Sequence, residues 1–147
     1  MKTTPRDLTE VELAARMRLA VMRLARRLRQ QAPAGVTPSQ LSVLATLSEK
    51  GAMTLGAIAE VERVQPPTMS RIISALEDEG LVRRVQDAGD KRRANILLTE
   101  DGHKLVATSR TRKTTYLVKR IEALPATDRA TLERASEVLE RILEDPA

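Results

Sequence analysis

The apolar and polar positions between Thr54 and Thr99 predict two helices separated by a turn, followed by a strand, a basic hairpin and a second strand. The first helix is short, and Leu55, Ile58 and Val61 are expected to anchor it. The second helix has four apolar residues at the spacing of one buried face, namely Met69, Ile72, Ile73 and Leu76. Its opposite face is small or polar around one long cation and is centred on Pro67, Ser70, Arg71 and Ser74.

A hairpin rich in cations follows the second helix. Gly80 is expected to end that helix as the residue after its C-cap, and the segments LVRRV and ANILLT are expected to form the arms. The segment QDAGD joins the arms, and Gly89 is expected to supply a positive φ at the tip. The cations of the arms are Arg83, Arg84, Lys91, Arg92 and Arg93. This order of elements predicts a winged helix-turn-helix in a mainly α chain with a small β-hairpin wing.

The outward face of the second helix suits a DNA major groove, because short side chains let a helix approach the base edges. Arg71 carries a planar guanidinium that binds a guanine edge or a phosphate, and the sequence does not choose between them. An arginine at the hairpin tip suits a narrow minor groove, and Asp90 is placed to hold it by a charge-assisted bond. The predicted DNA-binding residues are Gln65, Thr68, Ser70, Arg71, Ser74, Lys91, Arg92 and Arg93.

Simpler interpretations of the same residues stay open. Ser70 and Ser74 also fit an ordinary solvated helix face, and charges on a hairpin also protect a sheet edge from aggregation. The alternative function is a winged-helix module that binds another protein through this face. The salt dependence of DNA binding separates the two, because a protein interface need not release counterions.

Two runs of sequence, SRIISALEDEGLVRR and DKRRANILLTEDG, resemble the MarR family of bacterial transcription regulators. The family signature is Asp-x-Arg followed by Leu-Thr-x-x-Gly, and here it matches Asp90, Arg92, Leu98, Thr99 and Gly102. The resemblance extends over the whole chain and implies a homodimer on DNA. A two-fold dimer is expected to bind an inverted repeat of double-stranded DNA, and the leading hypothesis is a repressor. The resemblance also implies that Arg92 reaches the minor groove, oriented by Asp90, and that Ser70 and Arg71 lie on the recognition helix.

One position departs from the family pattern. The N-cap of the recognition helix is usually a small hydroxyl residue, whereas Gln65 stands there, followed by Pro66 and Pro67. Gln is a poor cap, although Pro suits the first helical position. We therefore expect the helix to form with a weakly capped first turn.

The resemblance further suggests an effector, a small organic and often aromatic acid, bound between the DNA-reading lobe and the dimer helices. Met17, Val21 and Tyr116 have a spacing that would suit the lining of such a pocket. Core packing is the favoured role for these three residues, so none of them is predicted as a ligand contact.

The flanking helices predict an association lobe. Thr9 with Glu12 and Thr37 with Gln40 form capping boxes that begin two helices. Apolar residues lie on several faces of the first helix, so a second subunit is expected to bury the excess, with a membrane-surface helix as the weaker alternative. We expect one chain, 1–147, with a winged-helix lobe at 37–99 and a helical dimerisation lobe at 1–36 and 100–147.

The composition further limits the class of binding partner. The 147 residues include 25 Lys and Arg against 20 Asp and Glu, and the net charge of +5 favours a polyanion. With one Tyr and no Phe or Trp, the chain lacks the rings on which single-stranded bases stack, which favours duplex DNA. With no Cys and only His103, it has neither a thiol sensor nor a site of several histidines for zinc. No catalytic motif occurs, so neither an enzyme nor a metal or cofactor is expected.

The N-terminal sequence bears on location. Arg16, Arg18 and Arg23 interrupt its apolar stretch, which does not fit a signal peptide. The sequence has no run of about 18 uncharged apolar residues, the length that spans a bilayer. We expect a cytoplasmic protein.

Overall fold

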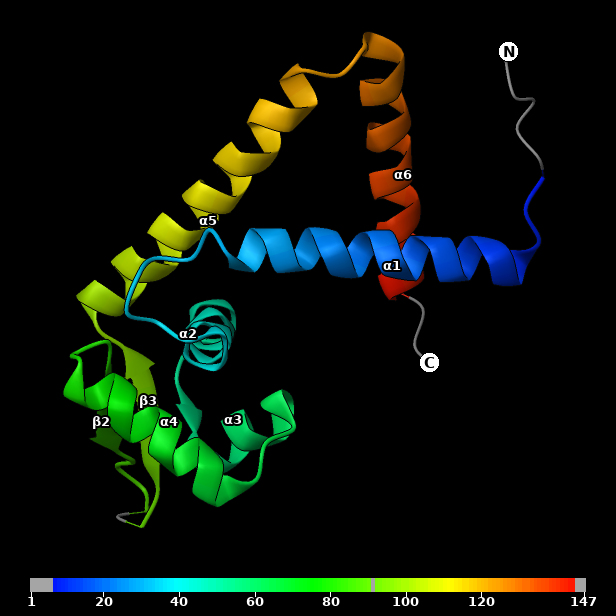
Figure 1. Cartoon of the computed structure of the whole chain (residues 1–147). Helices are drawn as coiled ribbons and strands as arrows, with labels where there is room; N and C mark the ends of the chain where they lie inside the picture. The colour runs from blue at the N-terminus through cyan, green and yellow to red at the C-terminus, as the bar shows by residue number, and fades with distance from the viewer. Residues whose placement is uncertain (1–6, 91, 145–147) are drawn as a thin grey trace. The chain divides into compact units, whose positions relative to one another are not determined.

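The computed structural model describes residues 7–90 and 92–144, which form six helices and one three-stranded sheet (Figure 1). The elements in chain order are α1 (Glu10–Arg29), α2 (Pro38–Lys50), β1 (Met53–Thr54), α3 (Leu55–Glu62), α4 (Pro66–Asp78), β2 (Val82–Gln86), β3 (Ala94–Leu98), α5 (Glu100–Glu122) and α6 (Ala126–Glu144). The predicted class, mainly α with a β-hairpin wing, is confirmed.

The sheet has the order β1-β3-β2, and both neighbouring pairs are antiparallel. β2 and β3 form the predicted hairpin, in register from Val82 opposite Leu98 to Gln86 opposite Ala94. β1 pairs Met53 with Ile96 at the other edge of β3. The sequence pattern does not predict β1, because a strand of two residues is too short to show an alternation of its own.

An apolar core lies between α2, α3, α4, the sheet and the start of α5. Its buried members are Val43, Leu44, Leu47, Ile58, Ala59, Met69, Ile73, Leu76, Leu81, Val82, Ile96, Leu98 and Val106. The predicted stripe of α4 is confirmed, with Ile72 only partly buried. Val61 is 46% exposed, so the expectation that it anchors α3 is wrong. On this short helix only Ile58 and Ala59 are buried.

The helix ends follow the local signals in the sequence. Both predicted capping boxes are present, at Thr9 and at Thr37. Gln65 makes no side-chain hydrogen bond as the N-cap of α4, in agreement with the expected weak capping. Gly80, at φ 73°, follows the C-cap of α4 as predicted. The Leu81 N–H donates to the Leu76 carbonyl at 2.9 Å, which closes a Schellman motif.

The junction between the wing and α5 is tight. The Thr99 hydroxyl accepts a hydrogen bond from the Gly102 N–H at 3.1 Å, which caps α5, and donates to the Gly80 carbonyl at 2.6 Å. A Cβ on Gly102 would overlap the carbonyl oxygen of Leu81. The Leu-Thr-x-x-Gly part of the signature therefore joins the end of the wing to the end of α4 and the start of α5.

The described chain divides within α5, between Lys113 and Thr114, into two compact units. The first unit contains α1, the winged helix and the first part of α5, and the second contains the end of α5 and α6. Neither α1 nor α6 has a buried residue in this single chain. Both helices expose large apolar side chains, including Val11 and Met22 on α1 and Ile142 and Leu143 on α6.

Candidate nucleic-acid interface

The second helix of the helix-turn-helix, α4, presents the predicted outward face. Thr68, Arg71 and Ser74 are exposed, and Ser70 is half-buried. Met69 and Ile73, on the opposite face, are fully buried and fix the rotation of the helix about its axis. Gln65 is exposed immediately before the helix begins. All five predicted residues of this segment thus lie on α4 or at its N-cap, and four of them are freely accessible.

The turn between α3 and α4 has an unusual backbone. Arg63 adopts the left-handed conformation at φ 53°, the one positive φ outside glycine among the described residues. The turn is closed by a hydrogen bond of 3.0 Å from the Val64 N–H to the Ala59 carbonyl. An L-residue with a side chain pays a steric cost there that glycine avoids.

The wing tip is shaped by aspartates and not by glycine. The Asp87 carboxylate accepts a hydrogen bond from the Gly89 N–H at 3.0 Å, an Asx turn. Gly89 does not adopt a positive φ, so that expectation is wrong. The side-chain acceptor of Asp87 closes the turn and removes the need for a left-handed residue.

Asp90 contacts Arg92 in two ways. Its Oδ1 accepts a hydrogen bond from the Arg92 backbone N–H at 3.0 Å and lies 3.7 Å from the guanidinium Nε. The Arg92 side chain is nevertheless 95% exposed. Arg93 is also exposed, whereas Lys91 lies outside the described residues. The wing therefore presents Arg92 to solvent while its backbone is fixed by the neighbouring carboxylate.

The two arginines of β2, Arg83 and Arg84, differ in their contacts. The Arg84 Nε donates to Glu77 Oε2 at 3.0 Å and so links β2 to the last turn of α4. Arg83 is exposed. Arg84 is therefore engaged within the protein, and the hairpin is held against the helix that carries Arg71.

A hollow of about 400 Å³ lies between the wing and the N-terminus of α3. It is lined by Thr54, Leu55, Gly56, Arg84, Arg92, Arg93, Ala94 and Ile96. Its charged lining residues are three arginines, of which Arg84 is paired with Glu77 and Arg92 with Asp90. The sequence pattern could not predict this hollow, because one wall comes from residues 54–56 and the other from residues 84–96, far apart in the chain.

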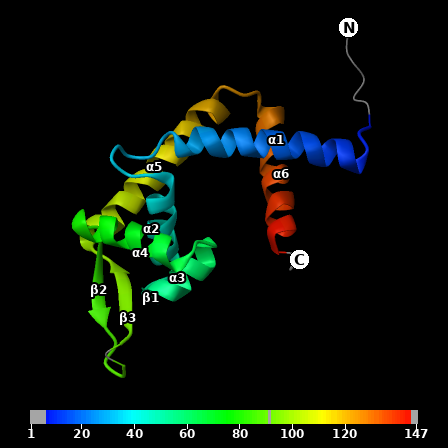
Figure 2. The same cartoon turned by 60° about the horizontal axis from the view of Figure 1, so that its bottom comes forward.

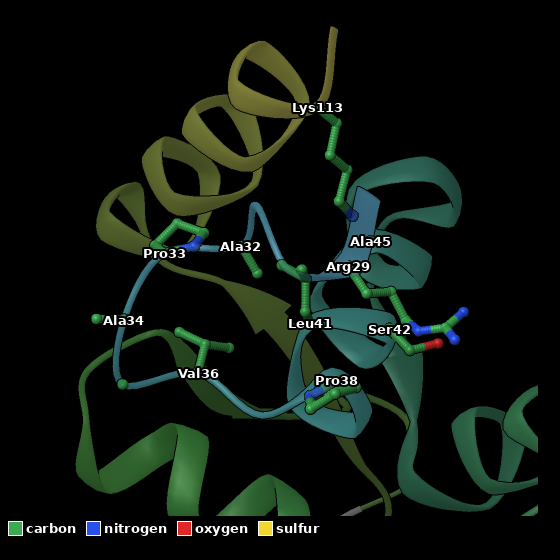
Figure 3. Close-up of a pocket in the computed structure, with 11 residues that line it drawn as sticks. Arg29, Ala32, Pro33, Ala34, Val36, Pro38, Leu41, Ser42, Ala45 and Lys113 are labelled. Atoms are coloured by element: carbon green, nitrogen blue, oxygen red, sulfur yellow. The ribbon is translucent and has the colours of Figure 1, made fainter. Parts of the chain in front are cut away.

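A second pocket, of about 390 Å³, lies at the end of α1 (Figure 3). It is lined by Arg29, Ala32, Pro33, Ala34, Gly35, Val36, Pro38, Leu41, Ser42, Ala45 and Lys113. Its walls are mainly apolar, and its only charged lining residues are the two cations. In the described part of the chain neither cation forms an ion pair. Met17, Val21 and Tyr116 do not line it.

Two further features bear on the class of protein. Residues 7–90 and 92–144 contain no group of three or more His, Asp or Glu side chains placed to hold a metal ion. Among the same residues, no helix has both the length and the apolar character needed to cross a bilayer.

The helix-turn-helix and the arginine-bearing hairpin define a winged helix-turn-helix protein. The MarR family model matches residues 36–94. An HTH-type transcriptional regulator of Mycobacterium leprae is 42% identical over 140 residues, which cover 94% of this chain and 98% of the relative. The chain belongs to the MarR family.

Solved structures share the fold over nearly the whole chain. A Pseudomonas aeruginosa PA01 protein described as a transcriptional regulator is 28% identical with a TM-score of 0.83, over 96% of this chain and 100% of that one. A mutant of Staphylococcus aureus MepR, bound to an oligodeoxyribonucleotide, is 23% identical with a TM-score of 0.71, over 94% and 100%. The winged-helix architecture is thus shared with proteins of low sequence identity.

Proposed function

We propose that this protein is a sequence-specific regulator of transcription that binds double-stranded DNA as a homodimer and represses at an inverted repeat. The observation that carries the proposal is that Arg71 on α4 and Arg92 on the wing are both exposed, on a unit whose hairpin projects beyond α4 (Figures 1 and 2). Membership of the MarR family and the DNA-bound MepR structure support the choice of DNA as partner. The proposal includes no catalytic step, and it places the protein in the cytoplasm, where it reaches DNA.

The two arginines have different roles in this proposal. Arg71 and the short side chains Thr68, Ser70 and Ser74 face a major groove, where side chains read base edges. Arg92 enters the adjacent minor groove, and Arg93 contacts the phosphates. Gln65 lies at the start of α4, near the phosphates that flank the groove. In a two-fold dimer the two copies of α4 would meet major grooves about 34–36 Å apart.

A footprint on the DNA flanking the protein's own gene tests this function. We expect a protected inverted repeat, and an affinity whose logarithm falls linearly with the logarithm of salt concentration, by about 0.9 for each phosphate neutralised. Arg92→Ala should weaken binding, whereas Arg129→Ala, which removes the same charge from an exposed position of α6, should not. Absence of protection, or binding without the salt law, would favour the protein-interaction module.

The homodimer is supported by the apolar faces that this chain leaves uncovered. Ile142 and Leu143 of α6 are 54% and 84% exposed, and Val11 of α1 is 79% exposed. Large apolar side chains exposed on a helix in this way are typical of a subunit interface. We expect sedimentation to give a dimer, and the double change Ile142→Glu with Leu143→Glu to give a folded monomer. Glu140→Gln, at an exposed neighbour, is the control that should stay dimeric.

The effector is proposed to be a small organic acid, bound in the pocket at the end of α1. Arg29 and Lys113 supply two cations to its carboxylate, and the apolar walls suit its hydrocarbon body. We expect calorimetry to detect 2-naphthoate binding and to detect little binding of the neutral 2-naphthamide. Arg29→Gln should reduce the affinity for the acid, and equal binding of acid and amide would contradict this assignment.

A further inference from the structure

One wall of the pocket is hydrogen-bonded to the helix-turn-helix. Ser42 lines the pocket from α2, and its hydroxyl donates to Glu62 Oε2 at 2.7 Å. Thr46, one turn further along α2, donates to Glu62 Oε1 at 2.7 Å but does not line the pocket. The Glu62 carboxylate is therefore held by two hydroxyls of α2, only one of which belongs to a residue that lines the pocket.

Glu62 occupies a sensitive place. It is the last residue of α3, where the negative end of the helix dipole disfavours a carboxylate, so the two donors offset an unfavourable position. The next residue, Arg63, is the left-handed one, and Gln65 gives α4 no side-chain cap. The turn between α3 and α4 thus contains a strained residue and leads into a weakly capped helix. The hydrogen bonds from α2 to Glu62 hold the residue at which this turn begins.

We propose that Ser42 couples the pocket to the recognition helix. The inference rests on the proposed effector site and names how that site regulates DNA binding. A serine hydroxyl has one hydrogen to donate. An organic anion held by Arg29 and Lys113 offers a second carboxylate acceptor on the pocket side. When Ser42 turns to the anion, Glu62 loses one of its two donors, the turn at Arg63 loosens, and α4 leaves the position that fits a major groove.

The coupling predicts different behaviour for the two hydroxyls. Ser42→Ala should imitate the anion-bound state, with DNA affinity reduced about five- to ten-fold without ligand and little further loss on adding 2-naphthoate. Thr46→Val also removes one donor from Glu62, so its DNA affinity should fall to a similar extent. Because Ser42 is intact in that variant, its response to 2-naphthoate should persist.

Calorimetry and fluorescence anisotropy separate binding of the anion from its effect. We expect Ser42→Ala to bind 2-naphthoate more weakly than the wild type, because the anion has lost one donor, but still measurably, because the two cations remain. At saturating concentration the bound ligand should no longer alter DNA affinity. A Ser42→Ala protein that responds to the ligand as the wild type does would overturn the coupling. If Thr46→Val also lost the response to the ligand, both hydroxyls would have only a structural role. That result would also overturn the coupling.

Hydrogen exchange tests the same coupling without DNA or ligand. The N–H groups of Val64 and Met69 bond to Ala59 and Gln65 at 3.0 Å and report on the turn and on the start of α4. In Ser42→Ala both should exchange about five-fold faster than in the wild type, whereas amides in the core of α2 should not. Unchanged exchange would overturn the coupling even if the effector is found. Faster exchange with no binding of 2-naphthoate would instead show that the proposed effector is wrong.

Discussion

The Oδ1 atom of Asp90 accepts a hydrogen bond from the backbone N–H of Arg92 at 3.0 Å and lies 3.7 Å from the Nε of the same arginine. The ion pair itself is exposed to solvent and adds little to folding stability. In the proposed DNA-binding role, the contact restricts the conformations of Arg92, and a restricted side chain loses less entropy on binding. Asp90 therefore acts on Arg92 through both the backbone and the charge.

Asp90→Ala should lower the affinity for duplex DNA by about three- to ten-fold, since the wing backbone and the guanidinium are both released. Asp90→Asn keeps an oxygen acceptor for the Arg92 N–H and loses only the charge, so its loss should be smaller. Anisotropy titrations with a labelled operator measure both, and the melting temperature should change little. A larger loss in the Asn variant than in the Ala variant would contradict the role of the backbone bond.

Replacing Arg71 or Arg92 by alanine should change DNA binding in different ways. Arg92→Ala should weaken binding about ten-fold to matched and mismatched duplexes alike, and reduce the salt slope by about one. Arg71→Ala should reduce the preference for the matched duplex, because it removes the group that we propose reads base edges. Titrations on both duplexes at several salt concentrations give the comparison. Equal effects on preference from the two variants would refute this division of roles.

The sequence predicted those parts of the structure that depend on neighbours a few residues apart. The capping boxes at Thr9 and Thr37 and the glycine after α4 are local patterns, and all are present. The wing tip shows the limit of such reasoning, because either Gly89 or the Asx turn of Asp87 can close it, and composition does not decide between them.

Long-range contacts were beyond the sequence pattern. Ser42 and Glu62 are 20 residues apart, and no periodicity relates a hydroxyl on one helix to a carboxylate at the end of the next. The pocket likewise combines Arg29 with Lys113, which only the packing of α5 brings together. The outward-facing residues of α4 could be predicted because one buried stripe fixes the opposite face of the same helix.

Gly102 should tolerate no larger residue. A Cβ at this position would overlap the Leu81 carbonyl oxygen, so Gly102→Ala forces the start of α5 away from the end of α4. We expect a loss of about 1–3 kcal/mol in the free energy of unfolding, measured by urea denaturation. Gly56→Ala, on α3, is the matched control, because a Cβ there meets nothing within 4 Å. This change should leave the free energy of unfolding unchanged or raise it by up to about 1 kcal/mol. Equal stability of the two variants would contradict the close approach.

Arg63 allows the backbone cost of the helix-turn-helix turn to be separated from the role of its side chain. Arg63→Gly and Arg63→Ala both remove the guanidinium, but only glycine adopts the left-handed φ of 53° without a steric penalty. The glycine variant should therefore be more stable than the alanine variant by about 0.5–1 kcal/mol, after allowing for the greater freedom of glycine in the unfolded chain. Urea denaturation measures the difference, and DNA titrations should give the two variants similar affinities, since both have lost the same charge. An alanine variant as stable as the glycine variant would mean that the turn relaxes out of the left-handed conformation in solution.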